Sequence, residues 1–209
     1  MSLDKKNSIN NILEEKRIFP PSKKFAENSN ISSQEELLSL KKQASDNPIQ
    51  FWESFAKSEL DWFEPFQTVL DSDNAPFFKW FKEGKLNITY NCLDRHIKNG
   101  LGAKTALIWE GEPGDSKKFT YEELLKEVCK AANALKEIGV QKGELVCIYM
   151  PMIPEAMFAM LACARIGAPH SVVFGGFSSE ALKDRLIDGN AKFIITADGG
   201  FRKDKVIEL

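Results

Sequence analysis

Two glycines and three cations are the residues whose types and spacing could bind a phosphate. Gly175 and Gly176 lie in "FGGFS", between the apolar run "HSVV" and the helix-like "SEALKDRLIDG". Arg202, Lys203 and Lys205 lie in "DGGFRKDK", directly after another apolar run. Backbone N–H groups at the start of a helix attract anions, and so do Arg and Lys side chains. The two segments therefore predict an anion site if the fold brings them together.

Both segments also have a purely structural interpretation. A glycine pair after a strand often serves only a tight turn that needs a positive φ. The charged run "FRKDK", residues 201–205, is by default a solvated face. The hypothesis of a binding site therefore depends on whether the two segments share one edge of a sheet.

Sharper catalytic motifs are missing from the sequence. It contains no GxxxxGK[ST] loop, no GxGxxG fingerprint and no GxSxG elbow. The two histidines, His96 and His170, have no Cys or carboxylate partner nearby in the sequence, so we assign both a structural role. The cysteines show no metal-ligand spacing and are expected to be reduced core thiols. They are Cys92, Cys129, Cys147 and Cys163. We predict no catalytic residue and no metal site in this chain.

The elements that would position the glycines and cations follow from hydrophobic periodicity. Three apolar runs, typical of strands buried on both faces, alternate with helix-like segments. The expected strands are 145–150, 170–174 and 192–197, and the expected helices are 154–167 and 178–189. Parallel strands joined by right-handed crossovers place their carboxyl ends at one edge, where ligands bind. The predicted fold class is α/β, with a parallel βαβαβ sheet and the candidate site at that edge.

The residues before this sheet predict a helical, aromatic-rich extension. Residues 1–31 are rich in Asn, Ser and Lys, which indicates a flexible arm. Ser33 and Glu36 have the capping-box spacing, so we expect a helix that ends before Asn47. Residues 49–81 hold three of the four tryptophans. Because the few basic residues there do not form an interleaved pattern that would support base stacking, we interpret this stretch as an aromatic mini-core rather than a base-stacking surface.

A β-hairpin and a long helix are expected next. Residues 104–120 have strand-type residues on both sides of a Gly/Pro/Asp turn, which predicts the hairpin. Thr120 and Glu123 form a second capping box, and the following helix has an apolar stripe that ends at Ile138. Gly139 is placed to cap that helix.

Composition indicates an ordinary globular protein. The chain has 209 residues, of which 43% are hydrophobic and 28% charged, and a net charge of −2. This balance lacks the basic excess of a dedicated nucleic-acid binder. No apolar run has the length of a signal peptide or a membrane span. We expect a cytoplasmic protein that binds neither nucleic acid nor a membrane.

Long segments of the chain resemble the acetyl-coenzyme A synthetases (acetate–CoA ligases) of the adenylate-forming, AMP-binding superfamily. They include "FWESFAKSELDWFEPFQTVLD", "LNITYNCLDRH", "KTALIWEGEPGD" and "FIITADGGFRKDK". The resemblance runs from about Ile18 to the last residue and covers the N-terminal third of such enzymes. After the flexible arm at 1–31, it implies a synthetase N-terminal segment at 32–100 and the truncated start of the AMP-binding domain at 101–209. Propionyl-CoA synthetases are the nearest alternative.

The resemblance also implies an activity. Enzymes of this family use ATP and Mg²⁺ to convert acetate into a bound acetyl-adenylate, and release diphosphate. They then transfer the acetyl group to coenzyme A (CoA), which gives acetyl-CoA and AMP. The implied substrates are thus small molecules: acetate, ATP and CoA.

The same resemblance assigns the anion site to CoA. It places the diglycine along the CoA channel and Arg202 at the 3′-phosphate-ADP portion. Lys205 stands where many family members have a second Arg, which keeps the charge but loses the bidentate geometry. The implied CoA-binding residues are Gly175, Gly176, Arg202, Lys203, Asp204 and Lys205.

The ATP loop, the acetate pocket and the catalytic Lys of the family would all lie beyond residue 209. We therefore expect this chain to be inactive alone and to contribute only part of the CoA site. Residues 205–209, "KVIEL", are expected to begin a helix. A sheet that stops after three strands should leave an edge and apolar faces uncovered, so we expect marginal stability or self-association. The alternatives are a residual CoA- or nucleotide-binding module and a non-catalytic interaction remnant.

Overall fold

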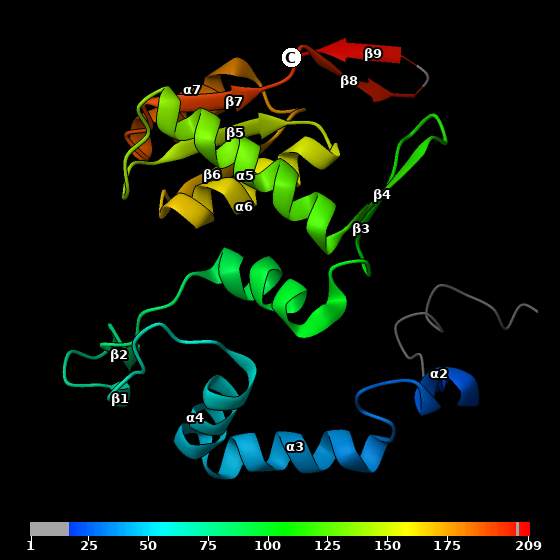
Figure 1. Cartoon of the computed structure of the whole chain (residues 1–209), viewed down its shortest axis with the longest axis vertical. Helices are drawn as coiled ribbons and strands as arrows, with labels where there is room; N and C mark the ends of the chain where they lie inside the picture. Colours follow the sequence, from blue (N-terminus) through cyan, green and yellow to red (C-terminus); the bar gives the residue numbers. More distant parts are fainter. Residues whose placement is uncertain (1–16, 204) are drawn as a thin grey trace, which may run out of the picture. The chain divides into compact units, whose positions relative to one another are not determined.

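The computed structural model describes residues 17–203 and 205–209, which fall into two compact units (Figure 1). The boundary lies between Ser54 and Phe55, inside helix α4 (Pro48–Glu59). Residues 55–100, which the sequence analysis assigned to an N-terminal segment, form one unit with the α/β part of the chain. No helix among the described residues is both long enough and apolar enough to cross a membrane.

The first unit contains α2 (Lys23–Glu27) and α3 (Gln34–Asp46). The short helix α2 lies within the predicted flexible arm, whose residues 1–16 are outside the described part. Helix α3 is confirmed, because the Ser33 hydroxyl accepts the N–H of Glu36 at 3.1 Å. The predicted capping box is only half formed, however. The Glu36 carboxylate accepts the N–H of Ser32 at 2.9 Å, one residue earlier than expected.

The second unit begins with the antiparallel pair β1 (Thr68–Asp71) and β2 (Lys79–Lys82). Beside this pair the rings of Trp62, Phe66 and Phe81 form a cluster, with centroid distances of 5.0 to 5.8 Å. Part of the predicted aromatic mini-core is thus present as this cluster. Phe63 and Phe77 are 60% and 71% exposed. The aromatic density of this stretch therefore overstated how much of it is buried.

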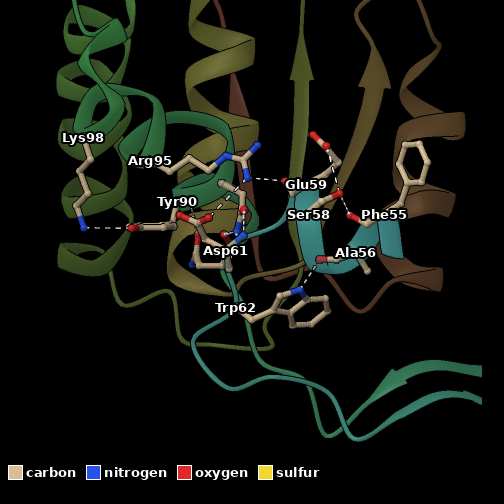
Figure 2. Close-up of polar contacts among 11 residues, drawn as sticks. Phe55, Ala56, Ser58, Glu59, Asp61, Trp62, Tyr90, Arg95 and Lys98 are labelled. Carbon is tan, nitrogen blue, oxygen red and sulfur yellow. Dashed lines mark hydrogen bonds and ion pairs between the residues drawn. The ribbon is translucent and has the colours of Figure 1, made fainter. Parts of the chain in front are cut away.

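Polar contacts join the end of α4 to the helical segment that holds the π-helical turns η1 (Tyr90–Asp94) and η2 (Ile97–Leu101) (Figure 2). The buried Asn91 accepts the N–H of Asp61 at 2.8 Å and donates its amide to the Asp61 carbonyl at 3.0 Å. About one helical turn after Asn91, the Arg95 side chain donates to the carbonyl of Glu59. These contacts fix the chain before and after the β1–β2 pair to each other.

The same helical segment is bound to α6 (Pro154–Ile166). The hydroxyl of Thr89, which is fully buried, donates to the Leu161 carbonyl at 2.8 Å. Arg165 makes a bidentate ion pair with Asp94, at 2.8 and 3.0 Å, and Asn87 donates to the Arg165 carbonyl at 3.0 Å. The side-chain amide thus satisfies a carbonyl at the open end of α6.

The predicted hairpin and long helix are confirmed. Strands β3 (Thr105–Glu110) and β4 (Ser116–Thr120) pair antiparallel, and α5 (Tyr121–Glu137) follows. Both bonds of the capping box between Thr120 and Glu123 are present, at 3.2 and 2.8 Å. Gly139 has a φ of 95°, as its capping position requires. The prediction is wrong for Ile138, which is 62% exposed because it lies past the helix, at its C-cap.

The central sheet is also confirmed. Strands β5 (Val146–Met150), β6 (His170–Phe174) and β7 (Phe193–Thr196) are parallel, in the order β6-β5-β7. The core lies between this sheet and the helices α5 and α6, with Val146 and Ile148 fully buried against them. Helix α7 (Ser179–Asp188) joins β6 to β7 and contributes no buried residue. The carboxyl ends of β5 and β6 lie level, since Met150 pairs with Phe174.

The chain after β7 differs from the prediction. Instead of a charged loop and the start of a helix, it forms an antiparallel hairpin of β8 (Gly199–Arg202) and β9 (Lys205–Glu208). Val206 pairs with Phe201, and Ile207 pairs with Gly200. β-Branched residues favour extended backbone, and here a partner strand is available within six residues. Within the "KVIEL" segment, Lys205–Glu208 is therefore a strand and not the start of a helix.

Candidate functional site

A hollow of about 540 Å³ lies beyond the carboxyl ends of β5 and β6, against the β8–β9 hairpin. Ligand pockets usually have volumes of about 300–1,000 Å³. Its lining includes Gly175, Gly176 and Arg202. The fold thus brings together the two segments that the sequence analysis singled out, at the predicted edge of the sheet.

The diglycine forms a tight turn, but not the kind for which glycine is usually required. The N–H of Phe177 donates to the carbonyl of Phe174 at 3.0 Å, which closes the turn over Gly175 and Gly176. Neither glycine has a φ in the left-handed region. A Cβ added at Gly176 would lie 2.8 Å from the Phe174 ring and 3.4 Å from Nη1 of Arg202. The missing side chain therefore allows the ring and the guanidinium to come close to the backbone.

The hydroxyl of Tyr149, the penultimate residue of β5, supports this turn. It lies 3.0 Å from the Phe177 carbonyl and 3.4 Å from the Gly175 carbonyl. Tyr149 was not among the residues predicted from the sequence. Its only signal was a polar group near the carboxyl end of the otherwise apolar strand "LVCIYM".

The start of α7 has the predicted cap and also a carboxylate. The Ser178 hydroxyl accepts the N–H of Ala181 at 3.3 Å, which confirms Ser178 as the N-cap. The backbone N–H of Glu180 itself, and then the hydroxyls of Ser179 and Ser178, lower the pKa of the Glu180 carboxyl. The Glu180 carboxylate therefore already occupies some of the hydrogen-bond donors at this helix end. An anion that approaches the helix end would meet this negative charge.

Of the three predicted cations, only Arg202 lines the hollow. Lys203 and Lys205 are exposed on the hairpin, and Asp204 lies outside the described residues. The backbone N–H of Lys203 donates to the carboxylate of Glu112, which reaches over from the β3–β4 connection. Glu112 itself lines the hollow and was not predicted, because its contact with Lys203 spans 91 residues.

The cysteines and histidines are only partly where we expected them. Cys147 and Cys163 are buried, and burial raises the pKa of Cys163 to about 11. Cys92 is exposed, so the expectation of a core thiol is wrong there. The ring of His96 lies 5.0 Å from that of Tyr121, a packing contact.

Within residues 17–203 and 205–209, no group of three or more His, Cys, Asp or Glu side chains is arranged to hold a metal ion. The hollow brings the Arg202 guanidinium close to the diglycine backbone, and its lining also holds the carboxylates of Glu112 and Glu208.

Comparison with known proteins confirms the resemblance. A protein-family model described as AMP-binding enzyme matches residues 93–208. A second, described as acetyl-coenzyme A synthetase N-terminus, matches residues 38–92. The two matches adjoin each other, and the second places the resemblance in the N-terminal portion of the synthetases.

The chain is similar to several curated proteins named acetyl-coenzyme A synthetase. The protein from Campylobacter jejuni is 55% identical over 188 residues, which cover 90% of this chain and 28% of the relative. The Helicobacter acinonychis protein is 54% identical over 191 residues, or 91% of this chain and 29% of the relative. The Streptomyces avermitilis protein is 54% identical over 199 residues, or 95% and 29%. The chain thus spans less than a third of the length of these relatives. Since the first family model covers more than half of its residues, the chain belongs to the AMP-binding enzyme family.

Proposed function

We propose that this chain supplies part of the CoA site of an acetate–CoA ligase. The complete reaction would convert acetate, ATP and CoA into acetyl-CoA, AMP and diphosphate through an acetyl-adenylate. The similarity to proteins named acetyl-coenzyme A synthetase supports the reaction. The observation that carries the CoA assignment is the approach of Arg202 to the diglycine turn in one hollow.

The residues of the proposed site would contact CoA in different ways. The planar guanidinium of Arg202 suits a phosphate, to which it can donate two parallel hydrogen bonds. Gly175 and Gly176 would let the ligand approach bare backbone. Lys203, Asp204 and Lys205 belong to the same assigned segment. The two lysines, which are exposed on the hairpin, would act through longer-range attraction.

We assign no catalytic residue to this chain and propose that it is inactive alone. The ATP-binding, nucleotide-binding and acetate-binding groups would come from other parts of a complete ligase. A net charge of −2 supports small-molecule substrates rather than nucleic acid. We propose a cytoplasmic location, without a membrane partner.

Calorimetric titration of CoA into the 209-residue chain tests the assignment. Arg202→Ala should weaken binding about tenfold or more, because a hydrogen bond to a charged group contributes about 1.5–3 kcal/mol. Lys126→Ala, which removes one exposed charge from α5, is the matched control and should bind as the parent chain does. Equal affinities for all three proteins, or no binding by the parent chain, would refute the CoA site.

A chimera distinguishes three hypotheses about this chain: a segment of a ligase, a residual CoA- or nucleotide-binding module, and a non-catalytic interaction remnant. The 188 aligned residues of this chain would replace their counterparts in the Campylobacter jejuni relative. A ligase segment should preserve acetate-dependent ATP–diphosphate exchange and acetyl-CoA formation. Placing Arg202→Ala in the chimera should lower acetyl-CoA formation at limiting CoA and spare the exchange, which needs no CoA. A folded chimera without exchange would favour the module or the remnant.

A further inference from the structure

We propose that Tyr149 is a positioning residue for phosphate binding, because its hydroxyl fixes the direction of the peptide groups in the Phe174–Phe177 turn. The inference rests on the proposed function, since it concerns the same hollow. It adds a residue from a different strand, β5, to the two segments that the resemblance assigns to CoA.

The contacts of the hydroxyl are all with backbone carbonyls of the turn. Tyr149 donates to the Phe177 carbonyl at 3.0 Å, and the Gly175 carbonyl lies within reach at 3.4 Å. The hydroxyl has one proton, so it donates to one carbonyl at a time. Tyr149 is itself part of the lining of the hollow. Both carbonyl oxygens therefore lie on the side of the turn that faces the Tyr149 hydroxyl, and either one can accept its proton.

The direction of the carbonyls sets the direction of the N–H groups. In a trans peptide the C=O and the N–H point in opposite directions. The peptide that carries the Gly175 carbonyl also carries the Gly176 N–H, and the Phe177 carbonyl shares its peptide with the Ser178 N–H. Both N–H groups therefore point away from Tyr149. Within the described part of the chain, neither has a hydrogen-bond acceptor.

This direction is not fixed by the turn alone. Type I and type II turns share the same closing hydrogen bond and differ by a flip of their central peptide. Here that peptide joins Gly175 to Gly176, and glycine at the second central position makes the flipped form accessible. The closing bond from Phe177 to Phe174 is compatible with either form. The Tyr149 hydroxyl favours the form that leaves the Gly176 N–H free, next to Arg202 Nη1.

Other contacts of the turn hold its side chains and not its central peptide. The rings of Phe174 and Phe177 meet edge to face at 6.4 Å. The guanidinium of Arg185 lies over the Phe177 ring at 4.7 Å. Neither contact involves the backbone between Gly175 and Gly176. Two free N–H groups and one guanidinium are the donors that a phosphate group needs.

Calorimetry of Tyr149→Phe with CoA and with pantetheine, which lacks phosphate, tests the proposal. CoA binding should weaken about three- to tenfold, as expected for the loss of one orienting hydrogen bond, and pantetheine binding should not change. Tyr121→Phe removes a hydroxyl from α5 and should leave both affinities unchanged. If Tyr149→Phe binds CoA as the parent chain does, or loses affinity for both ligands equally, the positioning role is wrong.

A second measurement uses the parent chain alone and tests the free N–H groups on which the proposal depends, even if Tyr149→Phe fails to fold. In an NMR titration with inorganic diphosphate, the amide protons of Gly176 and Ser178 should shift downfield as they bind the anion. No shift at either amide on saturation would overturn the proposal. Arg202→Ala keeps the two proposals apart. Unchanged CoA binding in that variant refutes the CoA site itself, whereas weakened binding there with unchanged binding in Tyr149→Phe refutes only the role of Tyr149.

Discussion

At the scale of single residues, opposite charges share one hollow. Arg202 lines it together with Glu112, whose carboxylate accepts the backbone N–H of Lys203. A bound phosphate would gain from the guanidinium and be repelled by the carboxylate. Glu112 therefore acts against the anion that Arg202 attracts, while it holds the tip of the β8–β9 hairpin.

Glu112→Gln should strengthen CoA binding by about two- to fivefold, because it removes one negative charge and keeps an amide oxygen for the Lys203 N–H. The gain should shrink as salt screens the charge. Glu110→Gln, in β3, removes a carboxylate that does not line this hollow and is the matched control. Calorimetry at low and at physiological salt would measure both variants. Weaker CoA binding by Glu112→Gln would show that the carboxylate supports the site instead.

The pair of Glu144 and Lys192 makes stability depend on pH. The two residues precede β5 and β7, and Nζ of Lys192 lies 2.8 Å from the Glu144 carboxylate. The hydrogen bond from Lys192, and then the N–H of Gln141, lower the pKa of Glu144 from its ordinary value of 4.5. A lowered carboxyl pKa contributes stability above pH 4.5, and this contribution is lost as the pH falls through the lowered value.

Glu144→Gln should therefore melt at a lower temperature than the parent chain at pH 7, and the two melting curves should converge towards pH 3. Glu137→Gln, on the exposed end of α5, should differ little from the parent chain at either pH. Thermal melts followed by circular dichroism would show the comparison. A difference that grows as the pH falls would contradict the assigned direction of the pKa shift.

At the scale of elements, the ion pair of Arg165 and Asp94 connects the η1–η2 segment to α6 and stabilises their contact. Both side chains are largely covered, with 28% and 18% of their surface exposed. Asp94→Ala should lower the free energy of unfolding by about 1.5–3 kcal/mol, because it leaves the guanidinium without its charged acceptor. Glu127→Gln, which removes the exposed pair with Lys130 on α5, should cost less than about 1 kcal/mol. Urea unfolding would measure the free energy of unfolding of both variants. Equal decreases in the two variants would contradict a stabilising role of the Arg165–Asp94 pair.

The regular elements could be predicted because their signals are local. Strands β5 to β7 and helices α5 to α7 follow from apolar periodicity, from the caps Thr120 and Ser178, and from Gly139. The β8–β9 hairpin could not, because two glycines and a charged run dominate its sequence, and its strands are fixed by pairing with each other. Local patterns carry no information about such pairing.

The candidate site was predictable in part for the same reason. The parallel sheet places Gly176 and the chain leading to Arg202 at one edge by topology alone. The roles of Tyr149 and Glu112 arise from contacts across 28 and 91 residues. A spacing rule cannot find such contacts. The sequence also suggested a glycine turn with positive φ, whereas the glycines are needed for close approach.

At the scale of the whole molecule, the sheet of the α/β unit leaves apolar surface uncovered. Val172 and Phe174 on the edge strand β6 are each 53% exposed, and Ile194 on the opposite edge strand β7 is 46% exposed. Neither strand has a further partner within the described residues. Unpaired edges that carry apolar side chains promote association.

We therefore expect the 209-residue chain to self-associate. Light scattering coupled to size-exclusion chromatography should give a mass above 23.6 kDa that rises with concentration. Ile194→Lys should reduce the association by placing a charge on the β7 edge, and it should leave CoA affinity unchanged because Ile194 does not line the hollow. A monomer that melts reversibly and cooperatively at high concentration would contradict the expectation.

If Arg202 binds the 3′-phosphate of CoA, the Arg202→Ala variant should lose any preference for CoA over dephospho-CoA. Dephospho-CoA lacks only the 3′-phosphate, so its titration into the parent chain and into Arg202→Ala completes a double-mutant cycle. The parent chain should bind CoA about tenfold more tightly than dephospho-CoA, and Arg202→Ala should bind the two with equal affinity. An undiminished preference for CoA in Arg202→Ala would contradict the assignment of Arg202 to the 3′-phosphate.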